Sequence, residues 1–216
     1  MNYKIDHIPI NKDKRPGTKM TATSITIHST ANEKSTAKNE CDNLGREGNT
    51  RTASFHIAVD DKQAVECIPL NEITYHAGKR EGNNTSISLE MCESGDRAKT
   101  IQNTVELVAK LIHERKWGVD KIKRHFDWSG KICPGILSKN NWEGWRAFKI
   151  QVQRELDKMD KNKLEKIKVS LHGKALEMEG IKENGTNHIP IRFLEQLGYE
   201  VGWKNNTVII NYKEVK

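Results

Sequence analysis

The sequence predicts an α/β fold, in which a mixed central β-sheet is flanked by helices and followed by a second, small α+β domain. Short segments that alternate apolar and polar residues are typical of strands, and they occur between longer segments with apolar residues at helical spacing. A charged stretch without a clear apolar face then precedes a group of shorter elements. The 216 residues suffice for one full domain and a small second one.

The predicted strands of the first domain follow a polar, irregular stretch, residues 1–23. In the first strand Ile25 and Ile27 lie on one face and His28 lies on the other. The turn residues Asp60-Asp61-Lys62 join two further strands into a hairpin. The expected strands cover residues 24–30, 54–60, 63–68, 86–92 and 122–126.

The predicted helices of this domain have their apolar residues on one face. Ser35 is expected to cap the first helix, and Gly45 and Gly48 are expected to end it. Trp145 and Phe148 are expected to be buried by the last helix. The three helices are predicted at residues 36–46, 100–116 and 142–156.

The charged stretch 157–166 is interpreted as a linker or as the frayed end of the last helix. A helix that begins at Pro190 is expected beyond it, because proline favours the first turn of a helix. The predicted domains are 1–157 and 167–216, with a linker at 158–166. Within the small domain we expect strands at 167–171 and 175–181, a helix at 189–198, and a hairpin of 201–203 with 207–211 about Asn205-Asn206.

The composition excludes several classes of protein. Apolar residues make up 35% of the chain and charged residues 30%, which is typical of a soluble globular protein and not of a disordered chain. No stretch approaches the roughly 18 apolar residues of a membrane helix, so no membrane insertion is expected. The first residues lack the apolar core of a secretory signal, which predicts cytoplasmic synthesis. Four cysteines without a C-x-x-C pair argue against a disulfide framework.

The net charge of +7 predicts attraction to polyanions without identifying them. Nucleic acid and the anionic polymers of a bacterial wall are both candidates, and an ordinary soluble surface is the third interpretation. Because no nucleic-acid motif and no interleaving of aromatic and basic residues occurs, we expect no nucleic-acid partner.

Three residues form a candidate metal site. His125 and Cys133 flank a glycine-containing loop long enough to aim both side chains at one point. His28 lies on the strand face opposite Ile25 and Ile27. A catalytic zinc takes three protein ligands and leaves one position for water. The alternatives are a structural histidine and a cysteine that merely fills the core.

Two charged residues add to this candidate site. Glu90 projects from the strand face opposite Leu89 and Met91, where a carboxylate needs a partner or a chemical role. A general base beside a metal-bound water is such a role. Lys131 lies two residues before Cys133, where an ammonium group can stabilise an oxyanion. An exposed edge-strand charge and a solvated lysine are the alternatives.

Five segments in order resemble one family, the zinc-dependent N-acetylmuramoyl-L-alanine amidases of the phage-lysozyme and peptidoglycan-recognition-protein type. The resemblance covers about residues 20–150. Each segment alone is unspecific, but five in the family's order are specific. They are I-T-I-H-S-T (25–30), S-F-H-I-A-V-D (54–60), Y-H-A-G (75–78), N-T-S-I-S-L-E (84–90) and R-H-F-D-W-S-G-K-I-C-P-G (124–135).

The resemblance implies a role for each candidate residue. One catalytic Zn²⁺ is expected, with Glu90 activating water and Lys131 stabilising the oxyanion. Phe55 stands where relatives often carry a catalytic tyrosine, so that hydroxyl role does not carry over. The implied zinc ligands are His28, His125 and Cys133, and the implied substrate-binding residues are His56, His76 and Asn84.

The C-terminal segment H-I-P-I-R-F-L-E-Q-L-G-Y-E-V-G-W (188–203) resembles the small N-terminal-like domain of copper amine oxidases. No cluster of His, Cys or Met there predicts copper binding. The hypothesis is a module for wall binding or for self-association into a homo-oligomer. A simple folding appendage is the alternative.

The expected function is hydrolysis of the amide between N-acetylmuramic acid and L-alanine in bacterial peptidoglycan. A cytoplasmic origin beside a substrate outside the membrane predicts release by lysis, as for a prophage endolysin freed through a holin. A mother-cell autolysin is one alternative. Two other classes are a peptidoglycan-binding module without turnover and a basic nucleic-acid-binding protein with a structural zinc.

Overall fold

The structure, a computed structural model, divides into two compact units, Met1–Leu156 and Asp157–Lys216. Within the described residues no helix is long and apolar enough to span a bilayer. The described residues are 1–161, 164–171, 174–183, 186–188, 190–191, 193–204 and 207–212.

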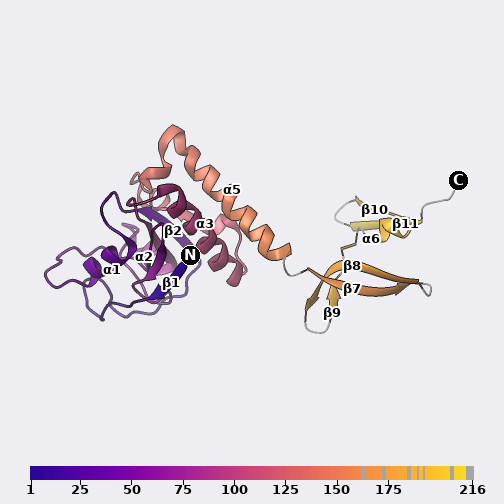
Figure 1. The fold of residues 1–216 in the computed structure, drawn as a ribbon, viewed down its shortest axis with the longest axis horizontal. Coiled ribbons are helices and arrows are strands. Elements are labelled where there is room, and N and C mark those ends of the chain that lie inside the picture. The colour runs from indigo at the N-terminus through magenta and orange to yellow at the C-terminus, as the bar shows by residue number, and fades with distance from the viewer. Residues whose placement is uncertain are drawn as a thin grey trace. The chain divides into compact units, whose positions relative to one another are not determined.

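The first unit contains a six-stranded sheet in the order β1-β4-β3-β5-β2-β6 (Figure 1). Strands β3 and β4 pair antiparallel, and the other four neighbouring pairs are parallel. This mixed sheet with helices around it confirms the predicted fold class. The strands are β1 (Asn2–Ile5), β2 (Ser24–Ser29), β3 (Ile57–Val59), β4 (Gln63–Glu66), β5 (Ser86–Met91) and β6 (Ile122–Arg124).

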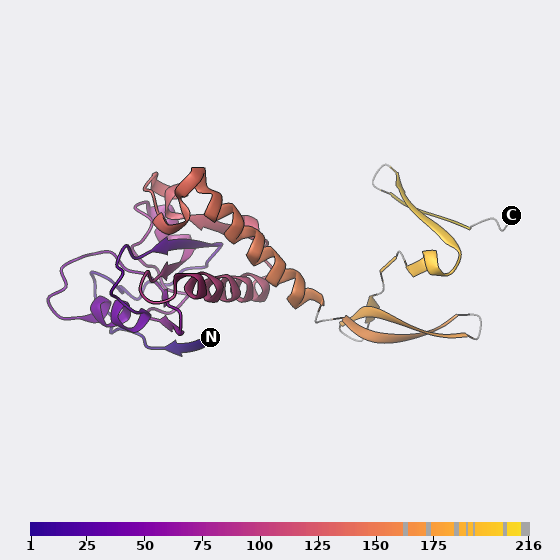
Figure 2. The ribbon, with the colours of Figure 1, turned by 45° about the horizontal axis from the view of Figure 1, so that its top comes forward.

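The helices of the first unit include the three that were predicted and two short ones that were not. Thr36 caps α1 by accepting a hydrogen bond from the Asn39 N–H, so the expected cap at Ser35 is wrong by one residue. Figures 1 and 2 show α5 running past α3. The helices are α1 (Ala37–Gly45), α2 (Arg80–Thr85), α3 (Arg97–Glu114), α4 (His125–Ser129) and α5 (Lys139–Lys161), with 3₁₀ turns at Val119–Lys121 and Gly135–Leu137.

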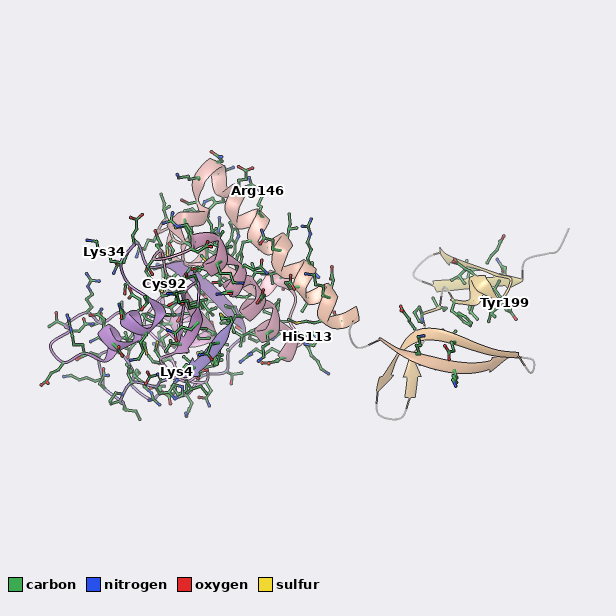
Figure 3. The ribbon with its side chains drawn as sticks, in the orientation of Figure 1. Lys4, Lys34, Cys92, His113, Arg146 and Tyr199 are labelled. Atoms are coloured by element: carbon green, nitrogen blue, oxygen red, sulfur yellow. The ribbon has the colours of Figure 1, made fainter. Side chains whose placement is uncertain are left out.

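The two faces of the sheet have different partners. Ala58 and Glu90 are register partners on one face, and Ala58 belongs to a buried cluster with residues of α1. Cys92, which lies in the interior of the first unit in Figure 3, joins this cluster. Ile57 and Leu89 are register partners on the opposite face, which α3 covers through its contacts with β3 and β5. The candidate site therefore shares its sheet face with α1.

Three elements of the first unit differ from the prediction. β1 was expected to be irregular, and its four residues are all exposed, so it has no buried face that could produce an alternating pattern. α2 lies in a segment predicted as a loop, and α4 replaces the end of the predicted strand 122–126 and the start of the following loop. Both helices are too short for apolar periodicity to indicate them.

The second unit contains two small sheets. β7 (Leu164–Leu171), β8 (Lys174–Glu183) and β9 (Thr186–His188) form one antiparallel sheet, and β10 (Tyr199–Lys204) pairs with β11 (Thr207–Tyr212) in a hairpin. The predicted strands and hairpin are confirmed. Within the described residues, α6 (Phe193–Gln196) is the helical part of the predicted helix 189–198. Residues 189 and 192 of that segment lie outside the described residues, and so does the predicted turn at 205–206. Since α5 continues to Lys161 and β7 begins at Leu164, regular structure occupies most of the expected linker.

Candidate active site

The candidate site lies at the carboxyl ends of three adjacent parallel strands, β5, β2 and β6. His28 is the penultimate residue of β2, and its register partner on β5 is Glu90. His125 follows β6 directly as the first residue of α4. Parallel strands present their carboxyl ends at one edge of a sheet, which is where open α/β sheets bind their ligands.

The three predicted ligands meet at this edge. His28 Nδ1 lies 3.2 Å from His125 Nδ1 and 3.6 Å from Cys133 Sγ. All three donor atoms lie within 4.8 Å of one another, and the three residues are buried. Zinc bonds of about 2.05 Å to nitrogen and 2.3 Å to sulfur at tetrahedral angles place such donors roughly 3.3–3.6 Å apart. The two distances from His28 match this spacing, and the set is compact enough to hold one zinc ion. Among the described residues no fourth His, Cys, Asp or Glu joins the group.

Local hydrogen bonds hold the loop that carries Cys133. Gly130 ends α4 in the left-handed conformation, at φ 75°, which turns the chain back. The Phe126 N–H then donates to the Cys133 carbonyl at 3.2 Å, and the Gly135 N–H donates to Ser29 Oγ at 3.0 Å. The thiol is thereby fixed between β2 and α4.

Burial sets the protonation of the ligands. It lowers the pKa of His28 well below its ordinary value, and the charges of His76, His125 and Lys131 act in the same direction. Burial and Lys131 also lower the pKa of His125, to about 4. The pKa of the Cys133 thiol is raised to about 11, mainly by burial. Neutral imidazoles are the form in which histidine binds a metal, whereas the thiol must lose its proton when it binds.

Glu90 has the surroundings expected of a catalytic carboxylate. Its Oε2 atom is buried and has no hydrogen-bond partner among the described residues. Burial raises the pKa of Glu90 to about 8; the charge of Glu40 adds to the rise and that of Lys131 opposes it. A dication beside the group would favour its ionised form.

A cavity of about 250 Å³ brings the predicted catalytic and ligand residues together. Lys131 is exposed, yet it lines this cavity together with Glu90 and the three ligands. A wider groove of about 980 Å³ adjoins it, and His76 and His125 line both. Asn84 lines the groove only. The arrangement combines three potential metal donors, a carboxylate whose Oε2 has no hydrogen-bond partner in the described part of the chain, and a cation at the end of an open groove.

His56 occupies a different environment from the other candidates. Its ring is fully buried. The Ser88 N–H donates to its Nδ1 at 2.9 Å, so the proton must be on Nε2, which donates to the Glu72 carbonyl at 2.7 Å. Both ring nitrogens are thus used inside the protein, which argues against the predicted contact with substrate.

Sequence reasoning did not single out three residues around the site. Tyr75 and Arg51 both line the 250 Å³ cavity, and Tyr75 also lines the groove. Asn83 accepts hydrogen bonds from the N–H groups of His76 and Ala77. Arg51 lies in an exposed loop without a periodic pattern, so nothing in the sequence indicates that it lines the cavity. Asn83 stands seven residues after His76, a spacing that indicates nothing by itself.

The comparisons with known proteins agree with this arrangement. The family model for N-acetylmuramoyl-L-alanine amidase, Amidase_2, matches residues 18–136, which include every ligand and both proposed catalytic residues. The chain therefore belongs to the N-acetylmuramoyl-L-alanine amidase family.

Particular relatives come from Bacillus subtilis strain 168. The chain is 40% identical over 146 residues to the amidase XlyB, covering 64% of this chain and 44% of XlyB, and 41% identical over 148 residues to the amidase CwlA, covering 65% and 52%. It thus spans about half the length of these curated relatives. The solved catalytic domain of XlyA superposes with a TM-score of 0.65 at 35% identity, covering 70% of this chain and 99% of that domain.

Proposed function

We propose that the first unit hydrolyses the amide bond between N-acetylmuramic acid and L-alanine in bacterial peptidoglycan, with one zinc ion held by His28, His125 and Cys133. The observation that carries this proposal is the convergence of three buried donors beside Glu90, without a fourth donor among the described residues. The relatives XlyB and CwlA are named N-acetylmuramoyl-L-alanine amidases, which supports the proposed choice of substrate.

A zinc ion held by His28, His125 and Cys133 would supply a Lewis acid and would make a water molecule acidic enough to attack near neutral pH. Glu90 accepts a proton from the attacking water and passes it to the nitrogen of the leaving L-alanine. The Lys131 ammonium group stabilises the negative oxygen that develops on the attacked carbonyl. Phe55 stands where relatives often carry a catalytic tyrosine. The proposed scheme therefore uses no tyrosine hydroxyl.

The groove accommodates the rest of the substrate. It leads away from His125 and is lined by Asn84, Tyr75 and the cationic side chains of Lys79 and Arg80. Stem peptides of peptidoglycan carry carboxylates, which such cations attract. We assign Asn84 to substrate binding on this basis.

The Glu90→Gln variant tests the function. It keeps the size of the side chain and removes the base, so we expect stoichiometric zinc and a loss of about 10²–10⁴-fold in turnover on purified cell walls. Glu114→Gln is the matched control, because Glu114 is a half-exposed residue at the end of α3.

Two results would count against the proposal. If Glu90→Gln turned over substrate as fast as the wild type, the assignment of Glu90 as general base would be wrong. Wild-type protein that sediments with walls but never lowers their turbidity would instead indicate a binding module without catalysis.

We further propose that the protein acts on the bacterial wall as a lytic enzyme, either an endolysin or an autolysin. The second unit is proposed to bind the wall or to mediate self-association. Its resemblance to the copper amine oxidase N-terminal-like domain supports a separate binding module, and no cluster of His, Cys or Met in its sequence predicts copper binding.

A further inference from the structure

His76 lies directly behind the ligand His28. Its Nδ1 atom is 3.1 Å from His28 Nε2, and the two rings are nearly perpendicular, at 87°. His28 turns its other nitrogen, Nδ1, toward His125 and Cys133. The His28 ring is therefore held between the donor cluster on one side and His76 on the other.

The tautomer of this pair follows from the metal site. A histidine that coordinates through Nδ1 carries its proton on Nε2. Within the described structure, His76 Nδ1 is the hydrogen-bond partner found for His28 Nε2. His76 must then accept at Nδ1 and carry its own proton on Nε2.

His76 has no ring nitrogen left for a substrate. Nδ1 is used by His28, and Nε2 is buried without a hydrogen-bond partner among the described residues. Burial, together with the charges of His56 and His125, lowers the pKa of His76 to about 3, and the nearby backbone groups of Gly82 and Ser86 only partly oppose this shift. His76 lines the groove, but its Nδ1 is hydrogen-bonded to His28 and its Nε2 is buried.

The turn that carries His76 is fixed to the elements that carry the ligands. Asn83 Oδ1 accepts from the N–H groups of His76 and Ala77 at 2.9 and 2.8 Å. Trp128 of α4 packs so closely on Gly82 that a Cβ there would come within 2.8 Å of the indole. The indole N–H in turn donates to Thr26 Oγ1 on β2 at 2.9 Å. His76 is thus positioned rigidly with respect to His28.

We propose that His76 is a positioning residue, which fixes the tautomer and the orientation of His28 for zinc, and is not a substrate-binding residue. The inference rests on the zinc site of the proposed function but not on hydrolysis. Removing a group that hydrogen-bonds to a metal ligand in this way typically weakens metal affinity about 10–100-fold.

A pair of isosteric variants tests the proposal in the full chain. His76→Asn places an acceptor oxygen near the position of Nδ1, whereas His76→Leu has the same shape and no acceptor. We expect His76→Leu to bind zinc about 10–100-fold more weakly in competition with a chromophoric chelator, and His76→Asn to remain within about threefold of wild type. The Co²⁺ absorption spectrum of His76→Asn should match that of the wild type.

Equal zinc affinity in both variants, with KM raised in both, would overturn the proposal and return His76 to substrate binding. If His76→Leu does not fold, ¹H–¹⁵N spectra of the zinc-loaded wild type decide instead. We expect both His28 and His76 to be protonated at Nε2, and a proton on His76 Nδ1 would overturn the proposal. Wild-type protein that takes up no zinc would refute the metal site itself, whereas normal zinc uptake without hydrolysis would refute only the activity.

Discussion

At the scale of single residues, the site was predictable wherever a strand pattern fixed the direction of a side chain. The alternation of Ile25, Ile27 and His28, and of Leu89 and Glu90, placed the imidazole and the carboxylate on faces that the structure shows to be the same one. The environment of His56 was not predictable, because its partners Ser88 and Glu72 lie 32 and 16 residues away.

His56 makes stability depend on pH. Burial lowers its pKa to about 4, below the ordinary 6.5 that the unfolded chain retains. Its contribution is therefore complete above pH 6.5 and is lost as the pH falls toward 4, where protonation of Nδ1 breaks the bond from Ser88. We expect the His56→Gln variant, which cannot titrate there, to be less stable than wild type at pH 7.

The difference in unfolding free energy between the two proteins should shrink by on the order of 2–3 kcal/mol between pH 6.5 and 4. Urea unfolding across this range, with the same zinc concentration throughout, measures it. A difference that stays constant with pH would show that His56 does not titrate as a buried neutral group.

At the scale of elements, regular segments with one buried face were predictable and short segments were not. β2, β5 and α3 each present a periodic pattern, whereas α2 and α4 are single short helices defined by tertiary contacts. α4 forms because Gly130 and Asp127 satisfy its two ends, and Asp127 accepts the Arg124 N–H at 2.7 Å. These hydrogen bonds are local, but they define a helix only because β6 ends at Arg124.

The contact between α2 and α4 depends on Gly82. A Cβ at this position would lie 2.5 Å from Ala77 Cβ and 2.8 Å from Trp128, closer than real contacts allow. We expect Gly82→Ala to lower the unfolding free energy by about 1–3 kcal/mol, as overpacking does, and to weaken zinc binding through the displaced turn.

Chemical denaturation and chelator competition measure the two effects. Gly202→Ala is the matched control, because apart from its chain neighbours no atom of the described part of the chain lies within 4 Å of the added Cβ, and its effect should be small. A Gly82→Ala protein as stable as wild type would show that α2 can move away from α4 without cost.

At the scale of the whole molecule, the mixed α/β class of the first unit could be predicted from pattern, but the role of the second unit could not. Its sequence contains no cluster of chemically reactive residues that would define a site. Residues 162–216 carry nine basic and seven acidic residues, a net charge of +2 out of +7. Most of the positive charge thus belongs to the rest of the chain.

This charge distribution makes a truncation informative. A chain ending at Lys161, the last residue of α5, should keep zinc binding and turnover on soluble wall fragments and should sediment less with whole walls. Binding that merely reflects net charge would persist in the truncated chain and would fall with added salt. Undiminished sedimentation at moderate salt would exclude a wall-binding role for the second unit.

The ladder between β2 and β5 sets the spacing between the side chains of His28 and Glu90. Because His28 and Glu90 face each other as register partners, a slip of one residue would send the carboxylate to the far side of the sheet. Main-chain pairing thus fixes the relative position of these two side chains. Arg51 and Asn84, in contrast, come from segments outside the sheet. The segment that carries Arg51 can therefore change without disturbing the pairing that holds His28 beside Glu90.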